Sequence, residues 1–126
     1  MKIYCICLPD RFAHCLAFFD SLHLRASFTT IVLKSDIENN RQTLVSNGLL
    51  CDKESLELKC GEVACALSHR NAWLAFLAST DDKCVIFEDD NAIPRNPKVT
   101  RLLLDKLFKL DTYDLLNLSP CWNKSR

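Results

Sequence analysis

Glycine is scarce in this sequence. Its 126 residues include only two glycines, Gly48 and Gly61, whereas average composition predicts about nine for a chain of this length. A loop that cradles phosphates with backbone N–H groups needs several closely spaced glycines. The sequence therefore excludes such a loop, and a phosphate-bearing ligand would have to be bound by side chains or by a metal ion.

Net charge and long apolar runs are missing as well. Sixteen basic and sixteen acidic residues cancel, so the chain lacks the basic surface that would make nucleic acid its main partner. No apolar run reaches the roughly 18 residues of a membrane-spanning helix. We therefore expect no transmembrane segment, which leaves peripheral association with a membrane open. The opening residues, MKIYCICL, are too short for a secretory h-region and have no cleavage site.

Cysteine is abundant, but the usual signals of its chemistry are absent. The sequence holds eight cysteines, with no C-x-x-C pair and no histidine at zinc-finger spacing from them. A disulfide framework would require a secretory context, which the sequence does not indicate. We therefore expect reduced, mostly buried thiols that act as small apolar residues. This state favours a cytoplasmic location.

The apolar pattern predicts alternating strands and helices. We expect strands at residues 2–8, 27–33, 84–87 and 113–118 and helices at residues 11–22, 61–78 and from Pro97, which follows a capping Asn96. Residues 34–59 are polar and predict a loop with one or two short helices. The order indicates one α/β domain over residues 1–126, in which helices cover both faces of a mostly parallel sheet of about four core strands.

Three adjacent acids, Glu88, Asp89 and Asp90, follow the expected strand at residues 84–87. In open parallel sheets, ligands bind beyond the carboxyl ends of the strands. Adjacent carboxylates repel one another unless a cation lies among them, and Mg²⁺ or Mn²⁺ prefers oxygen ligands. In an extended segment Asp89 points away from the other two, so we expect one or two of the three acids to bind the metal. The alternative is a solvated acidic turn that caps the next helix, and spacing alone does not separate these hypotheses.

A second group lies on the helix expected at residues 61–78. Glu62 and His69 are seven residues apart and share a face. His69 is suited to contact a ribose or diphosphate or to transfer a proton, but it could equally be packed and held by a carboxylate or carbonyl. Trp73, on the same stripe, we expect to be a core residue. Arg11, just after the first strand, could meet a phosphate or be an ordinary surface residue.

These segments together resemble glycosyltransferase family 25. Residues 61–73, GEVACALSHRNAW, resemble the family's GE-x-G-C-x-x-S-H-x-x-x-W segment, and residues 85–90, VIFEDD, are similar to its ILEDD segment. Residues 113–118, YDLLNL, resemble its next strand, and residues 3–8 with Arg11 resemble its first strand and turn. The family includes bacterial lipooligosaccharide galactosyltransferases and, more distantly, collagen galactosyltransferases.

The resemblance implies a GT-A fold and an inverting, metal-dependent hexosyl transfer from a UDP-sugar, most simply UDP-galactose, to a glycan acceptor such as lipooligosaccharide. It implies Mn²⁺ or Mg²⁺ as the cofactor, bound by two acids of the strand end. It further implies a set of donor-binding residues. The metal ligands would be Asp89 and Asp90, and the donor-binding residues Leu8, Arg11, Ser68, His69, Glu88 and Asp89.

The chain also departs from the family pattern. Cys7 stands where the family usually has Asn, Ala64 where it has Gly, and residues 33–36 replace its D-A-x-D-G segment. The resemblance implies that the sequence corresponds to the N-terminal, donor-binding part of a family domain, about half of it. We therefore expect the acceptor-side base to be absent, and the 126 residues alone to transfer no sugar.

Two alternatives to an active transferase come from other functional classes. The first is a truncated, non-catalytic remnant or sugar-nucleotide-binding module. The second is a phospho-acceptor receiver domain, which needs an acidic pair after the first strand. Here Leu8 is followed by Pro9, Asp10 and Arg11, which disfavours the receiver domain.

Overall fold

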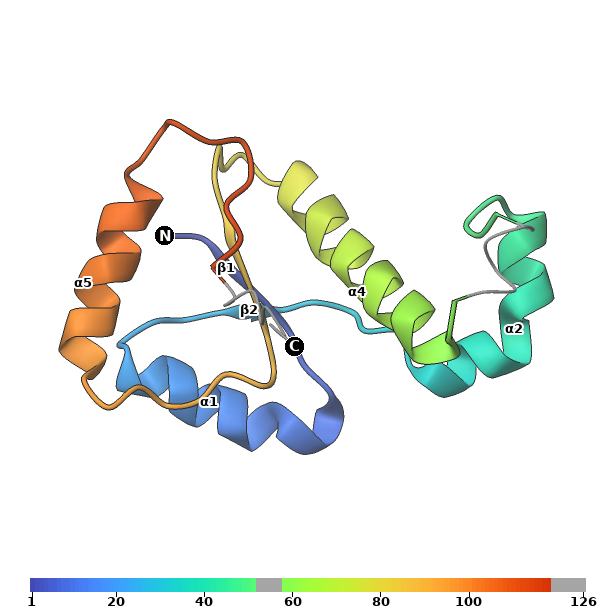
Figure 1. Cartoon of the computed structure of the whole chain (residues 1–126), viewed down its shortest axis with the longest axis horizontal. Helices are drawn as coiled ribbons and strands as arrows, with labels where there is room; N and C mark the ends of the chain where they lie inside the picture. Colours follow the sequence, from blue (N-terminus) through green and yellow to red (C-terminus); the bar gives the residue numbers. More distant parts are fainter. Residues whose placement is uncertain (52–57, 119–126) are drawn as a thin grey trace, which may run out of the picture.

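A computed structural model describes residues 1–51 and 58–118 of the chain. Its elements confirm an α/β architecture (Figure 1). In chain order they are β1 (Ile3–Ile6), a short 3₁₀ helix (Pro9–Arg11), α1 (Phe12–Ser21), β2 (Ser27–Phe28), α2 (Lys34–Ser46), α4 (Cys60–Leu77), β3 (Val85–Glu88) and α5 (Pro97–Phe108). None of the described helices is long and apolar enough to cross a membrane.

The sheet is parallel, with β1 in the middle in the order β2-β1-β3. Tyr4 lies opposite Ser27 on one side, and Ile6 lies opposite Glu88 on the other. Because the strands run in the same direction, the carboxyl ends of β1 and β3 meet at one edge of the sheet. We call this edge, with Leu8 after β1 and Glu88 to Asp90 at the end of β3, the ligand edge.

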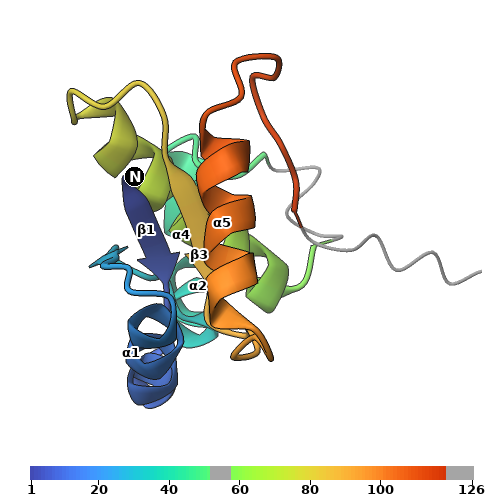
Figure 2. The same cartoon turned by 90° about the vertical axis from the view of Figure 1, so that its left-hand side faces the viewer.

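Helices cover both faces of the sheet, as the sequence predicts. Ile3 and Cys5 of β1 pack into one core with α1, and Leu104 of α5 packs against the same core. Tyr4 alternates to the opposite face, on which α4 contacts β1. Figures 1 and 2 show the sheet between α5 and α4, with α2 beyond α4.

The core beneath the ligand edge is aromatic. Phe18 and Phe19 of α1 meet Phe87 of β3 with ring centroids 5.5 and 5.4 Å apart, in tilted, edge-on arrangements. Such pairs favour a defined geometry over a loose apolar contact. They fix β3 one residue before the acids begin.

Helix starts follow local capping signals. The Asn96 side chain accepts a hydrogen bond from the Val99 N–H at 3.2 Å, and Pro97 occupies the first turn, so the predicted start of α5 is confirmed. At the start of α4, Glu62 accepts a bond from the Lys59 N–H at 2.8 Å. Such bonds satisfy backbone groups that the first turn of a helix leaves unpaired.

The strand predicted at residues 27–33 is much shorter in the structure and ends at Phe28. The cause is a competing set of partners on α4. The Val32 N–H donates to the Ser68 hydroxyl at 2.9 Å, and the Asn71 side chain donates to the Thr30 carbonyl at 2.9 Å. These bonds draw residues 30–32 away from the sheet and onto the helix.

The polar stretch at residues 34–59 contains a longer helix than expected. Helix α2 runs for 13 residues, and only Ile37 among them is buried, where it packs on Val63 and Ala64. A single buried contact leaves little periodicity to detect. Residues 52–57 of this stretch lie outside the described range.

The strand predicted at residues 113–118 is wrong, and so is the fourth core strand. The described residues form a sheet of three strands, and 113–118 are not part of it. The Tyr113 hydroxyl donates to the Leu107 carbonyl at 2.7 Å, which ties the segment to the end of α5. Leu115 is 87% exposed, so the apolar pattern here does not correspond to burial.

Two further expectations about burial need correction. Trp73 is 53% exposed rather than a core residue, because the buried positions of α4 are Val63, Ala64, Ser68 and Ala72 on another face. The seven cysteines within the described ranges are unpaired, as expected, but of these only Cys5 and Cys15 are buried.

Candidate functional site

Asp89 links the ends of two neighbouring strands at the ligand edge. Its carboxylate accepts a hydrogen bond from the Leu8 N–H at 2.8 Å. The Arg11 guanidinium donates to the Asp89 main-chain carbonyl at 3.0 Å. Three of the residues predicted to bind the donor therefore lie together, although they are 78 and 81 positions apart in the chain. Arg11 also brings a positive charge to an edge that is otherwise acidic.

The acidic turn has two further supports. The His14 ring donates through Nε2 to the Asn91 carbonyl at 2.7 Å, and the Asn91 side chain donates to the Glu88 carbonyl. Sequence reasoning assigned neither residue to the site. The position of His14, three residues after Arg11 and therefore on the same side of the chain's first helical turns, is a signal that could have indicated it.

Glu88 faces α4 because of strand alternation. Phe87 packs into the core beneath α1, so the next side chain points to the other face of the sheet. There a Glu88 carboxylate oxygen lies 2.7 Å from Nε2 of His69. The side chains are 50% and 27% exposed, respectively, so this is a solvent-accessible pair. The predicted residues His69 and Glu88 are thus in contact.

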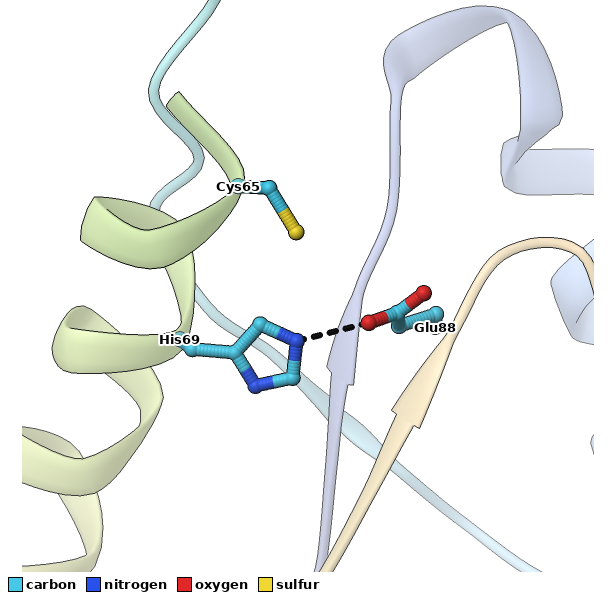
Figure 3. A group of neighbouring side chains, drawn as sticks. All are labelled: Cys65, His69 and Glu88. Carbon is cyan, nitrogen blue, oxygen red and sulfur yellow. Dashed lines mark hydrogen bonds and ion pairs between the residues drawn. The ribbon is translucent and has the colours of Figure 1, made fainter. Parts of the chain in front are cut away.

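Cys65 completes this second group. Ligand atoms of Cys65, His69 and Glu88 all lie within 4.8 Å of one another, and Figure 3 shows the three side chains pointing toward a common centre. The sequence alone predicts Cys65 to be a small apolar thiol rather than a ligand. Its four-residue spacing from His69 places both side chains on one face of α4. The third partner, Glu88, comes from β3, so the spacing along the helix alone does not indicate the group.

Ser68 and Glu62 have other contacts. Ser68 is 3% exposed, and its hydroxyl accepts from the Val32 N–H and donates to the Ala64 carbonyl at 2.8 Å. Glu62 caps the start of α4. Neither side chain is part of the group around Glu88, and both stabilise the helix that carries His69.

The thiols near the edge are held in their protonated form. Burial, and then the hydrogen bond from Cys15 at 3.3 Å, raise the pKa of Cys7 to about 12. Partial desolvation by neighbouring atoms, and then the nearby Glu88 carboxylate, raise the pKa of Cys65. Cys7 and Cys65 are therefore neutral thiols near pH 7.

A separate hollow of about 520 Å³ lies between β2 and α4, lined by residues that include Tyr4, Thr30 and Asn71. None of the predicted metal-binding or donor-binding residues lines it. It is open to solvent and its lining contains no acidic or basic side chain, whereas the ligand edge combines carboxylates with the Arg11 guanidinium. We therefore give the edge more weight than the hollow as the functional site.

Comparison with models of known protein families gives a match over nearly the whole chain. The family model described as "Glycosyltransferase family 25 (LPS biosynthesis protein)" matches residues 1–124. No curated protein and no solved structure matches the chain. The match spans the ligand edge and the whole of α4.

Proposed function

Because this chain belongs to glycosyltransferase family 25, the family of LPS biosynthesis proteins, we propose that its ligand edge binds a UDP-sugar for hexosyl transfer to a glycan. The observation that carries the proposal is the contact of Asp89 with Leu8 and Arg11. It brings an acid, a guanidinium and a strand end together where open parallel sheets bind ligands. The sugar implied by the sequence resemblance is galactose, and the implied acceptor is a lipooligosaccharide-type glycan.

The donor diphosphate needs positive charge, and this chain has no glycine-rich loop to supply backbone donors. Arg11 is exposed at the edge and is suited to contact a phosphate with its free N–H groups. Asp89 and Asp90 are adjacent oxygen donors of the kind that Mn²⁺ or Mg²⁺ binds. We assign them as the metal ligands, and a bound ion would supply positive charge against the leaving diphosphate.

The remaining residues take positioning roles in this proposal. The Leu8 N–H holds the Asp89 carboxylate, and His14 holds the turn through Asn91. His69 and Glu88 lie on the α4 side of the same edge, within reach of the sugar or ribose hydroxyls. Ser68 is buried and supports α4, so we assign it a role in support rather than in direct contact with the donor.

The proposed reaction inverts the anomeric centre, since an acceptor hydroxyl would attack C1 of the sugar from the side opposite the diphosphate. We assign no catalytic base, because Glu62 is committed to capping α4. A cytoplasmic location agrees with the unpaired cysteines of the described ranges and remains part of the proposal.

Release of UDP from UDP-galactose, measured with and without a lipooligosaccharide acceptor in the presence of Mn²⁺, tests this function. Acceptor-dependent release that is lost in Asp90→Ala and kept in Asp82→Ala supports transfer; Asp82 is an exposed acid before β3, at the far end of the sheet. Such turnover would also place the base within this chain, with the exposed Asp114 as the first residue to substitute. Donor binding without release would instead favour the sugar-nucleotide-binding module, and failure to bind any UDP-sugar would contradict both.

A further inference from the structure

Cys65, His69 and Glu88 form a mixed sulfur, nitrogen and oxygen cluster. Cys65 and His69 lie one turn apart on α4, and Glu88 reaches them from the end of β3 (Figure 3). All three ligand atoms lie within 4.8 Å of one another. Both elements that carry the cluster are regular and pack against β1, so the side chains are held on a rigid frame.

The spacing fits a small tetrahedral ion. Zinc lies about 2.0–2.3 Å from nitrogen, oxygen and sulfur ligands, which places tetrahedral ligand atoms about 3.3–3.5 Å apart. The separation of His69 and Glu88, 2.7 Å, has to widen slightly, and Cys65 has to approach by a small side-chain movement. Cys65 and Glu88 are exposed, so this adjustment disturbs no packed core.

The ligand types select the ion. Thiolate and imidazole together favour Zn²⁺ and related borderline or soft ions, whereas Mg²⁺ and Mn²⁺ prefer carboxylates and water. A cluster with one thiol, one imidazole and one carboxylate therefore differs in preference from the neighbouring acid pair of Asp89 and Asp90. Three protein ligands also leave a fourth position open, as in zinc sites that accept water or a substrate group.

We propose that Cys65, His69 and Glu88 form a binding site for a thiophilic divalent ion such as Zn²⁺, separate from the donor metal at Asp89 and Asp90. The two sites face different elements, because the Glu88 side chain contacts His69 on α4 whereas the Asp89 carboxylate is bound to the Leu8 N–H after β1. On binding, the Cys65 thiol transfers its proton to solvent and coordinates as thiolate. His69 coordinates the ion through a ring nitrogen. Its hydrogen bond with Glu88 is then replaced by bonds from both side chains to the same ion.

Cobalt(II), a spectroscopic substitute for zinc, tests the site without any sugar nucleotide. Titration of the reduced protein with Co²⁺ should produce a thiolate-to-cobalt charge-transfer band in the near ultraviolet that Zn²⁺ removes and excess Mg²⁺ does not. Cys65→Ser should abolish the band. The matched control is Cys51→Ser, which alters another exposed, unpaired cysteine and should leave the band unchanged.

Two more variants locate the remaining ligands. His69→Gln should weaken Co²⁺ binding by more than the roughly 10–100-fold that loss of an outer-sphere partner costs. Asp90→Ala should leave the band intact, which separates this site from the proposed donor metal. A failure of UDP-sugar binding would therefore not affect this result.

The proposal is overturned if the wild-type protein gives no band, if the band persists in Cys65→Ser, or if Asp90→Ala removes it. A second measurement needs no variant. Zn²⁺ should protect Cys65 from alkylation by N-ethylmaleimide while Cys51 remains reactive, as followed by peptide mass spectrometry. Equal alkylation of Cys65 with and without Zn²⁺ would show that His69 and Glu88 contact each other without forming a metal site with Cys65.

Discussion

The Nε2 atom of His69 lies 2.7 Å from a carboxylate oxygen of Glu88, and this contact joins α4 to the carboxyl end of β3. It brings a residue of the helix that covers one face of the sheet to the acidic strand end. The two segments on which the family resemblance chiefly depends therefore meet at one place in the fold. Because both side chains are partly exposed, we expect their contact to contribute little to the stability of the domain. We expect it to act mainly in ligand binding at the ligand edge.

Replacing Glu88 tests that distinction. Glu88→Gln removes the negative charge and keeps a hydrogen-bond acceptor for His69. Because a solvent-exposed charged pair contributes little to stability, the free energy of unfolding should fall by less than about 1 kcal/mol. Urea denaturation measures the change. The control is Glu38→Gln, which removes the exposed partner of Lys34, 3.4 Å away on α2. A loss above about 2 kcal/mol for Glu88→Gln alone would contradict a mainly functional role.

Ser68 should behave in the opposite way. Ser68→Ala removes the buried hydroxyl that accepts from the partly buried Val32 N–H, and the unpaired N–H should cost about 1–3 kcal/mol of unfolding free energy. The affinity for UDP-sugar should be unchanged at a temperature where the variant is folded. Ser46→Ala, which removes an exposed hydroxyl bound to the Gln42 carbonyl, should change stability by no more than about 0.5 kcal/mol. Loss of donor affinity in a folded Ser68→Ala protein would place Ser68 in the site instead.

The central strand should dominate stability. Ile3 is 1% exposed within the core beneath α1, and truncation of a buried Ile to Ala costs about 2–5 kcal/mol. Ile3→Ala should therefore lower the urea midpoint substantially. Leu77→Ala, at a position that is 74% exposed, should leave it almost unchanged. Similar effects of the two substitutions would be inconsistent with the described core.

The raised thiol pKa values predict slow alkylation. The thiolate is the reactive species, and burial raises the pKa of Cys7 to about 12 and that of Cys5 further. At pH 8, iodoacetamide should modify the exposed Cys51 and leave Cys5 and Cys7 unmodified until the protein unfolds, as read by peptide mass spectrometry. Rapid modification of Cys7 in the folded protein would contradict the raised pKa of its thiol.

The same shift has a consequence for stability. The unfolded thiols lose their protons above about pH 9, but the folded ones retain them, so the unfolded state binds fewer protons and stability falls as pH rises. The loss should occur between about pH 9 and pH 12, and Cys7→Ser should make it smaller. A urea midpoint that is equally sensitive to pH in Cys7→Ser would argue against this origin.

Local signals in the sequence predicted much of the fold. The apolar run of β1, the helical pattern of α4 and the Asn96–Pro97 start of α5 are confirmed because each depends on residues close in the chain. The strand predicted at residues 113–118 failed for the opposite reason. Its apolar pattern allowed a strand, but pairing requires a neighbour in the sheet, and Tyr113 binds the end of α5 instead.

In the candidate site too, features set by neighbouring residues were predicted, whereas features set by packing between distant segments were not. The position of Glu88 to Asp90 at a strand end followed from the sequence, since it needed only a strand and a rule about parallel sheets. The contact of Asp89 with Leu8 and the approach of Cys65 to Glu88 depend on register and helix packing. The spacings Arg11–His14 and Cys65–His69 place each pair on one side of a helix, but they do not encode the distances to the end of β3, so Cys65 and His14 were not predicted as site residues.

Calorimetric titration of UDP-galactose, with and without Mn²⁺, tests the central claim most directly. We predict that Mn²⁺ strengthens binding to the wild-type protein and to Asp82→Ala, and that Asp90→Ala abolishes the effect of the metal. Binding that is independent of Mn²⁺ and unchanged in Asp90→Ala would contradict the assignment of the acidic strand end as the donor and metal site.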